Sequence, residues 1–304
     1  IEQGIFRRRL GEPAQHLLKF DRRRRNFLAA HDRRNCRPGT KSDSSRIRID
    51  FDLFMNEVSG MTSLLSSKPI DPRDRLIVAL DLPDAESARA LVVELGDAVV
   101  FYKIGLELFM TGGYFDLLRW LVGQGKKVFV DLKFFDVPET VRSAVRALAG
   151  SGASFATIHG NQAIMEAAVK DKGDLKILAV TVLTSLDRGD LDDLGFACEV
   201  DKLVLSRARR ALAAGVDGIV SSGLEAPMIR RELGDRLLVV TPGIRPVENK
   251  PADDQKRTVD VAQAFRNGAD YIVVGRPIRQ AASPRQAAIG IQQTIREVFS
   301  RPRG

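Results

Sequence analysis

Two ammonium and two carboxylate side chains are spaced so that they could act together on one small charged group. Three of them, Asp131, Lys133 and Asp136, belong to the stretch 131–136 (DLKFFD), and the fourth is Lys103. If residues 127–133 form a strand, alternation places Asp131 and Lys133 on the same face. Lys103, in the preceding strand-like segment, can reach the same carboxylate. An ammonium beside a carboxylate in a partly dehydrated cleft can donate a proton or stabilise developing negative charge.

Each of these residues also has a simpler structural explanation. Asp136, followed by Pro138 and Glu139, is typical of a helix N-cap. Lys103 and Asp131 could form a structural ion pair, although a buried pair usually adds little stability. His159 alone is better explained as a hydrogen-bonded core histidine, and we give it no catalytic role. Gly275 and Arg276 alone would be a plain turn with a solvated arginine.

Further polar residues follow other strand-like segments, and their joint position argues for a site. They are Asp81 after the first segment, Thr184 and Ser185 after the fifth, Arg245 after the seventh, and Gly275 and Arg276 after the eighth. The carboxyl ends of parallel strands meet at one rim, where active sites of barrels lie. Convergence of so many polar groups on one rim favours an active site over separate structural roles.

The elements that must position these residues alternate between strand-like and helical patterns. Strand-like runs cover residues 75–81, 98–104, 127–133, 154–159, 176–183, 217–221, 236–241 and 270–274. Helical runs cover 85–95, 113–122, 139–149, 163–170, 201–214, 224–233, 259–266 and 284–299. Eight repeated βα units predict an α/β protein with a (β/α)8 TIM barrel. A doubly wound open sheet is the competing fold, but no Gly-x-Gly-x-x-Gly turn follows the first strand.

The amino-acid composition argues against several classes of protein. The chain has 304 residues, 44% of them apolar and 28% charged, enough to bury one large core or two small ones. No apolar run reaches the roughly 18 residues of a membrane span, so we expect a cytoplasmic protein that does not contact membranes. Two cysteines and three histidines, with His159 the only one beyond residue 60, argue against multi-histidine metal sites and catalytic triads. We therefore expect no metal.

The first 60 residues differ from the rest in charge. Residues 1–60 hold 14 Lys and Arg and 8 Asp and Glu, which accounts for most of the net charge of +8. This arginine-rich leader is predicted to be disordered, or an extension upstream of a natural start at Met61 or Met55, and residues 61–304 to form the barrel. A basic arm that binds nucleic acid is the alternative, but we do not expect nucleic acid as a partner, because the remainder is almost neutral.

The motifs together resemble one enzyme family. The stretch 131–140 (DLKFFDVPET) is similar to the signature of bacterial-type orotidine 5′-phosphate decarboxylases, and the resemblance covers residues 73–299. It includes 79–81 (ALD), 103–105 (KIG), 180–185, 241–245, 253–255 (DDQ) and 274–276 (VGR) in the family's order. The spacing Asp-x-Lys-x-x-Asp occurs in a wider superfamily, and Lys103 and Arg276 make the resemblance specific.

The resemblance implies a lyase that converts orotidine 5′-phosphate into UMP in pyrimidine biosynthesis without metal or cofactor. Lys133 would donate a proton to C6, Asp131 would lie against the substrate carboxylate, and Lys103 would orient Asp131 and a ribose hydroxyl. Asp136 and Thr140 would be supplied across the interface of a homodimer.

The remaining roles implied by the resemblance concern substrate binding. Asp81 would bind the ribose, and Thr184 and Ser185 would face the base. The phosphate would be held by Arg245, Gln255, Gly275 and Arg276, in agreement with the place of phosphate sites in TIM barrels. Residues 246–257 are a candidate lid. Two alternatives remain: a sister enzyme that acts on a sugar phosphate with Mg²⁺, and a nucleic-acid-binding protein that uses its leader.

Overall fold

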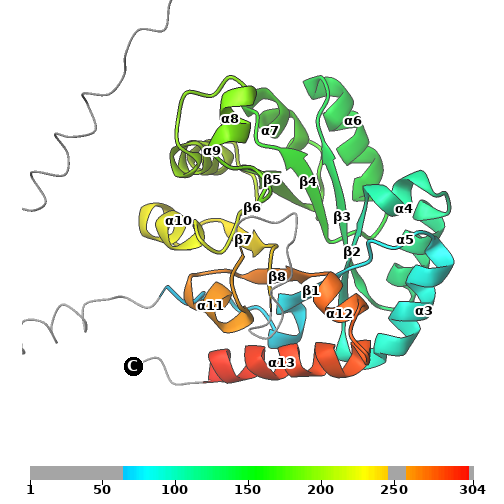
Figure 1. The fold of residues 1–304 in the computed structure, drawn as a ribbon. Coiled ribbons are helices and arrows are strands. Elements are labelled where there is room, and N and C mark those ends of the chain that lie inside the picture. The colour runs from blue at the N-terminus through cyan, green and yellow to red at the C-terminus, as the bar shows by residue number, and fades with distance from the viewer. Residues whose placement is uncertain (1–63, 246–257, 301–304) are drawn as a thin grey trace, which may run out of the picture. The chain divides into compact units, whose positions relative to one another are not determined.

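Eight parallel strands close into a barrel in sequence order, β1 to β8 (Figure 1). The computed structural model describes residues 64–245 and 258–300, so the leader and the candidate lid lie outside the described residues. The strands are β1 Leu76–Ala79, β2 Phe101–Gly105, β3 Lys127–Phe134, β4 Phe155–His159, β5 Lys176–Val180, β6 Gly218–Val220, β7 Leu238–Thr241 and β8 Tyr271–Val274. The predicted (β/α)8 barrel is confirmed.

Helices surround the barrel, and α13 runs along one side of it (Figure 1). They are α3 Ala85–Leu95, α4 Leu106–Met110, α5 Tyr114–Gly123, α6 Pro138–Ala149, α7 Gln162–Ala168, α8 Arg188–Asp193, α9 Val200–Ala213, α10 Ala226–Leu233, α11 Val261–Arg266, α12 Arg276–Arg279 and α13 Pro284–Ser300, with 3₁₀ turns η1 Pro72–Arg75 and η2 Gly96–Ala98. The eight predicted helices are present. The sequence analysis did not predict α4, α8 and α12, which have 5, 6 and 4 residues.

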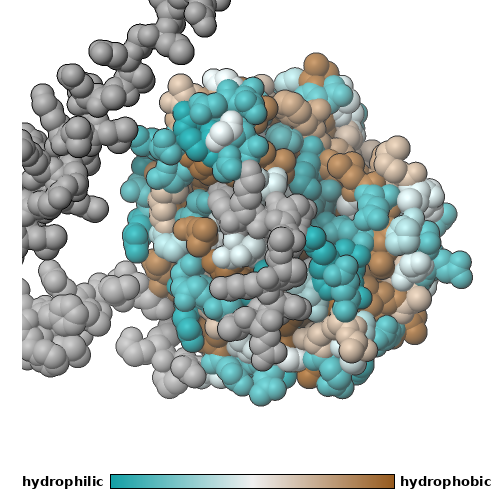
Figure 2. Space-filling view, viewed as in Figure 1, coloured by the Kyte–Doolittle hydropathy of each residue, from teal (hydrophilic) through white to brown (hydrophobic). Residues whose placement is uncertain are grey.

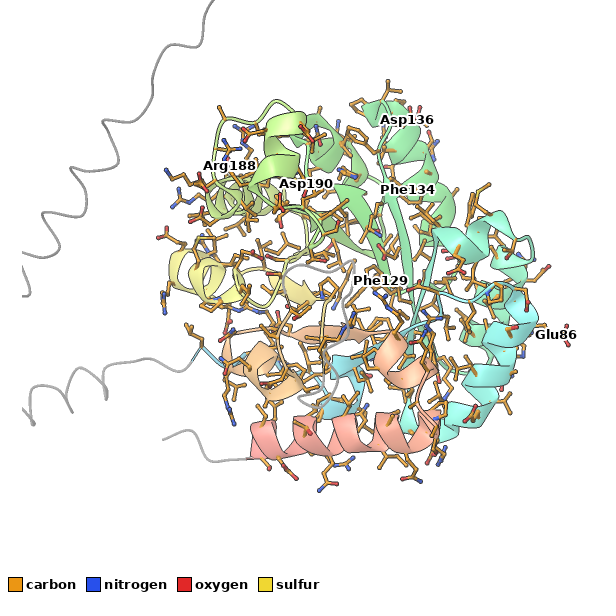
Figure 3. The ribbon with its side chains drawn as sticks, viewed as in Figure 1. Glu86, Phe129, Phe134, Asp136, Arg188 and Asp190 are labelled. Atoms are coloured by element: carbon orange, nitrogen blue, oxygen red, sulfur yellow. The ribbon has the colours of Figure 1, made fainter. Side chains whose placement is uncertain are left out.

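Apolar side chains fill the barrel interior. They come from alternate positions of the strands and include four aromatic rings, those of Phe101, Phe129, Phe155 and Tyr271. Phe155 packs edge-to-face on Phe101, with ring centroids 5.0 Å apart, and on Tyr271 at 5.1 Å. Phe129 lies at the centre of the molecule in Figure 3. These rings form a floor, because the next inward position on β2, β3 and β4 is polar: Lys103, Asp131 and Thr157.

A buried ion pair fixes the opposite end of the barrel. Asp270, which precedes β8, is fully buried. Its carboxylate accepts hydrogen bonds from Arg230 at 2.7 Å, Lys68 at 3.1 Å and the backbone N–H of Val239 at 2.8 Å. The Ser66 hydroxyl also donates to Asp270. These contacts tie the segment 64–70 to the strands β7 and β8.

Among the described residues, no helix combines the length and the apolar character that crossing a bilayer requires.

We predict that Asp270→Asn strongly destabilises the fold. The change removes the nearest counter-charge of the buried Arg230 guanidinium, so the free energy of unfolding should fall by about 3–5 kcal/mol. Urea unfolding of the full chain measures this loss. The matched control is Glu232→Gln, which removes the surface ion pair with Arg209 and should change stability by at most about 1 kcal/mol. Equal urea midpoints for the two variants would contradict the prediction.

Candidate active site

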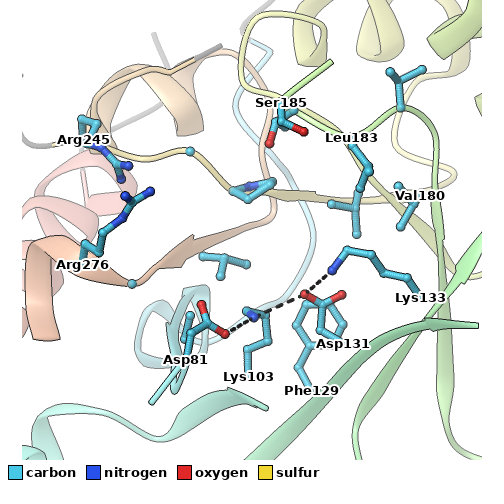
Figure 4. A pocket seen from close by; sticks show the side chains of 18 of the residues that line it. Asp81, Lys103, Phe129, Asp131, Lys133, Val180, Leu183, Ser185, Arg245 and Arg276 are labelled. Atoms are coloured by element: carbon cyan, nitrogen blue, oxygen red, sulfur yellow. Dashed lines mark hydrogen bonds and ion pairs between the residues drawn. The ribbon is translucent and has the colours of Figure 1, made fainter. Parts of the chain in front are cut away.

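Four charged side chains form a continuous array around one rim of the barrel. The ammonium of Lys103 on β2 lies 2.8 Å from Oδ1 of Asp81, just beyond β1, and 3.3 Å from Oδ2 of Asp131 on β3. The same Oδ2 lies 3.0 Å from the ammonium of Lys133. Figure 4 shows the resulting chain of contacts, in which negative and positive groups alternate. Alternation along β3 places Asp131 and Lys133 on the inner face, as predicted, while Leu132 packs against the outer core.

Lys103 and Asp131 remain charged although both side chains are largely buried. Burial by itself would raise the pKa of Asp131, but the ammonium groups of Lys103 and Lys133 outweigh burial and hold that pKa below its ordinary value. Burial would lower the pKa of Lys103, but Asp131 and Asp81 outweigh it and raise the pKa above its ordinary value. Both groups are therefore ionised at neutral pH.

The backbone of β3 is irregular where the array forms. The pairing of β3 with β4 shifts register between Val130 and Phe134. Within the described ranges, Lys133 is the one non-glycine residue with positive φ, at 49°. A left-handed conformation at such a residue costs on the order of 1–3 kcal/mol, and such strain is concentrated at functional sites. Sequence alternation predicts the face of each side chain but not this bulge.

Thr157 on β4 is a site residue that the sequence analysis missed. Its hydroxyl donates to Oδ1 of Asp131 at 2.9 Å and accepts the backbone N–H of Lys133 at 3.0 Å. The sequence offered one signal, since Thr157 follows the inward-facing Phe155 by two residues. On the same strand, the sequence analysis considered His159 and not Thr157.

A cavity of about 300 Å³ opens above the array. Nine of the predicted site residues line it: Asp81, Lys103, Asp131, Lys133, Thr184, Ser185, Arg245, Gly275 and Arg276. The guanidinium groups of Arg245 and Arg276 lie near each other, across the cavity from Lys133 (Figure 4). A cavity with a charged array on one side and two guanidinium groups on the other suits an organic substrate that carries an anionic group at each end.

Several proteins that resemble this chain in sequence or fold are named orotidine 5′-phosphate decarboxylases. The sequence matches the family model described as "Orotidine 5'-phosphate decarboxylase / HUMPS family" over residues 74–291. An orotidine 5′-phosphate decarboxylase of Methylococcus capsulatus is 68% identical over 240 residues, which cover 79% of this chain and 99% of that protein. One of Xanthomonas euvesicatoria is 52% identical, over 75% of this chain and 94% of that protein. The crystal structure of orotidine 5′-phosphate decarboxylase from Lactobacillus acidophilus has a TM-score of 0.65 at 35% identity, and covers 73% of this chain and 99% of that one.

This chain belongs to the orotidine 5′-phosphate decarboxylase / HUMPS family. The predicted family, the lyase activity and the place in pyrimidine biosynthesis are confirmed. The roles assigned to individual residues stay predictions.

Two residues predicted from the decarboxylase resemblance do not line the cavity described here. Asp136 and Thr140 are exposed and line a second, shallower cavity, between β3 and α6. Figure 3 shows Asp136 at the periphery of the barrel, near the start of α6. Gln255 lies outside the described residues.

Helix capping does not explain Asp136. The N-cap residue of α6 is Val137, and it makes no side-chain capping hydrogen bond. The carboxylate of Asp136 instead accepts the backbone N–H of Val137 at 2.6 Å. The capping alternative considered from the sequence is therefore wrong.

His159 lies beside the site but does not line the cavity. Its ring packs against Phe135, with centroids 4.6 Å apart. Burial, and then the positive charges of Arg207 and Lys133, lower the pKa of His159 below its ordinary value. The imidazole is therefore neutral at neutral pH.

The charged array differs in kind from a metal site. Within residues 64–245 and 258–300, no group of three or more His, Cys, Asp or Glu side chains is arranged to hold a metal ion. The two carboxylates that approach each other, Asp81 and Asp131, have the ammonium of Lys103 between them. In this family member, a fixed ammonium supplies the positive charge that both carboxylates need.

We predict that the effect of Lys103→Met on stability depends on pH. The folded-state pKa of Asp131 is depressed, so its ion pairing stabilises the fold above the unfolded-state pKa and is lost as pH falls through the folded-state pKa. Without Lys103, the pKa of Asp131 should rise. The difference in Tm between wild type and variant should be largest at neutral pH and narrow toward acid pH.

Thermal unfolding of both proteins between neutral and acid pH measures this difference. Lys127→Met is the control, because Lys127 lies on the same sheet but pairs with Asp74 at the surface, and it should change Tm less. A gap between wild type and Lys103→Met that stays constant over the range would contradict the prediction.

Proposed function

We propose that this enzyme decarboxylates orotidine 5′-phosphate to UMP with Lys133 as the proton donor to C6, and that it does so without metal or cofactor. The observation that carries this proposal is the position of the Lys133 ammonium. It lies 3.0 Å from the carboxylate of Asp131, in a cavity that Arg245 and Arg276 also line. A nucleotide carboxylate and a phosphate could occupy the two sides of this cavity.

The chemistry requires a fixed cation at the reacting carbon. The bond between C6 and the carboxylate breaks, carbon dioxide leaves, and the electron pair stays on C6 in an orbital that the ring cannot delocalise. The Lys133 ammonium stabilises this charge and transfers a proton to C6, which gives UMP and a neutral amine. Water then returns the proton to Lys133. No electron acceptor is needed, since the pair that leaves the broken bond forms the new C–H bond.

Asp131 and Lys103 prepare the site for this step. Because the pKa of Asp131 is held low, its carboxylate is charged and faces the carboxylate of the substrate. Their mutual repulsion is relieved as carbon dioxide leaves, which favours the transition state over the bound substrate. Lys103 holds Asp131 on one side and Asp81 on the other. In this proposal Asp81 binds the ribose.

The phosphate group supplies binding energy away from the reacting carbon. Arg245 and Arg276, with Gly275 between the end of β8 and α12, form the phosphate side of the cavity in this proposal, and Gln255 completes it. Thr184 and Ser185 face the base. Energy from phosphate binding can be used to hold the reacting carboxylate against Asp131.

The Mg²⁺-dependent sugar-phosphate alternative fits this site less well. A metal-bound enediolate needs several carboxylate ligands, whereas here the ammonium of Lys103 lies between the carboxylates of Asp81 and Asp131. The nucleic-acid alternative depends on residues 1–60, which are outside the described part of the chain, and it gives no role to the charged array.

We also propose a homodimer in which Asp136 and Thr140 complete the cavity of the partner subunit. Large apolar side chains are exposed on two consecutive βα units, the second of which also carries these two residues: Leu106, Phe109, Met110, Phe115, Phe135 and Val137. Figure 2 shows hydrophobic surface on the side of the barrel where α4 and α5 lie. Exposed apolar groups of this size typically mark an interface. A second copy is the occupant that would bring Asp136 to a charged array.

A cytoplasmic location belongs to the same proposal. Phosphorylated nucleotides carry charge and do not cross lipid bilayers unaided. The enzyme must therefore share a compartment with its substrate.

We predict that Lys133→Ala abolishes turnover but preserves nucleotide binding. Loss of the cation and proton donor should lower kcat by about a hundredfold or more. The change in orotidine 5′-phosphate absorbance, followed with EDTA present, measures turnover, and UMP titration measures binding. The control is Lys127→Ala, which changes a lysine at the other end of the same strand and should keep full activity.

Two results would contradict this proposal. Lys133→Ala with wild-type kcat would exclude the assigned proton donor. Wild-type activity that disappears under EDTA would favour the metal-dependent alternative.

We predict that mixing Asp131→Ala with Asp136→Ala protein restores activity. In a hybrid dimer, one cavity receives Asp131 from one subunit and an intact Asp136 from the other. Equal mixing should give about one quarter of wild-type activity, because half of the dimers are hybrids with one complete site. Mixing Asp131→Ala with Lys133→Ala is the control and should restore nothing, since both residues act within one subunit. Absence of recovery despite demonstrated subunit exchange would overturn the shared site.

A further inference from the structure

The hydroxyl of Thr157 lies where β3 departs from regular strand geometry. It accepts the backbone N–H of Lys133 at 3.0 Å and donates to Oδ1 of Asp131 at 2.9 Å. Thr157 is fully buried and does not line the cavity. The hydroxyl of Thr157 therefore links the backbone of Lys133 to the side chain of Asp131. The hydroxyl itself has no access to substrate.

The register of the sheet shows why this hydroxyl matters. Val130 pairs with Ala156, and the next pair along the ladder is Phe134 with Ile158. Three residues of β3 therefore lie opposite Thr157 alone, and Lys133, the last of the three, has its positive φ there. In this bulge the hydroxyl of Thr157 serves as acceptor for a backbone N–H, a role that a carbonyl has in a regular ladder.

The two oxygens of Asp131 are held from different sides. Oδ2 contacts the ammonium groups of Lys103 and Lys133, whereas Oδ1 accepts from Thr157. Without the hydroxyl, Oδ1 is a buried acceptor with one bond fewer, and the carboxylate is freer to rotate away from the two lysines.

We propose that Thr157 is a positioning residue for the decarboxylation. It holds Lys133 in the left-handed conformation and Asp131 in the orientation that faces both ammonium groups. This inference rests on the roles proposed above for Lys133 and Asp131, and it adds a requirement for a hydroxyl on the neighbouring strand.

Several charged or titratable groups surround Asp131 and bear on its ionisation. Lys103 faces it from β2, Lys133 from its own strand and Tyr114 from α5. Burial, with a smaller contribution from Asp131, raises the pKa of Tyr114, so the phenol stays neutral. His159 on β4 lies near Lys133, and Asp81 acts through Lys103. These groups are the same in all variants of Thr157, so a difference between variants reports on the hydroxyl.

The test compares Thr157→Val, which keeps the shape but removes the hydroxyl, with Thr157→Ser, which keeps the hydroxyl. Thr157→Val should lower kcat by roughly tenfold or more and change KM less. The acid limb of its kcat/KM profile should move to higher pH, because the lost donor favoured the ionised form of Asp131. Thr157→Ser should restore both properties to near wild type.

Thr181→Val is the matched control. Thr181 is equally buried, beyond the end of β5, and its hydroxyl donates to the backbone carbonyl of Val220 at 3.0 Å. Loss of this hydroxyl can lower stability but should leave the acid limb in place. UMP binding confirms that each variant is folded, and Thr157→Ala replaces the valine variant if that one does not fold.

Two outcomes would overturn the inference: a hydroxyl-free variant with wild-type kcat and acid limb, or a serine variant as impaired as the valine one. Lys133→Ala measured in parallel separates this failure from that of the proposed function. If Lys133→Ala is inactive while Thr157→Val is normal, only the role of Thr157 is wrong. If Lys133→Ala retains turnover, the assigned proton donor is wrong.

Discussion

The site depends on one buried carboxylate, that of Asp131, shared between two ammonium groups. A carboxylate in this position without a counter-charge would take up a proton, and lysines brought together without it would repel each other and lose protons. Because the hydrogen bonds within these ion pairs weaken steeply when their geometry is lost, the groups must be held in fixed positions. Four consecutive strands do this: Asp81 follows β1, Lys103 lies on β2, Asp131 and Lys133 on β3, and Thr157 on β4.

The fold could be predicted from the sequence because the barrel repeats one simple pattern, in which each strand-like run is followed by an amphipathic helix. That Asp131 and Lys133 share one face of their strand followed from alternation alone. The bulge in β3 did not, because a register shift depends on which residue of the neighbouring strand lies opposite, and alternation within one strand contains no such information. For the same reason Thr157 was missed. The position of Asp136 outside the cavity of its own chain was anticipated from the family resemblance, and no periodicity in the sequence indicates it.

The two ends of the barrel use buried charge for different purposes. At the amino-terminal end, Asp270 is surrounded by Arg230, Lys68, Ser66 and the backbone of β7, and every partner is part of the chain. At the carboxyl-terminal end, the array around Asp131 borders a cavity, so its partners include whatever molecule occupies that space. Stability and chemistry are thus placed at opposite ends of the barrel, and a change at one end can be made without disturbing the other.

The floor of aromatic rings beneath the array also limits the paths into and out of the site. Phe101, Phe129, Phe155 and Tyr271 close the barrel from below, so the cavity has no exit in that direction. Under the proposal that Lys133 is the proton donor, neither the nucleotide, nor carbon dioxide, nor the proton that restores the ammonium passes through this floor. In that proposal, Lys133 recovers its proton from the carboxyl-terminal side of the barrel, which is also the side at which the nucleotide binds.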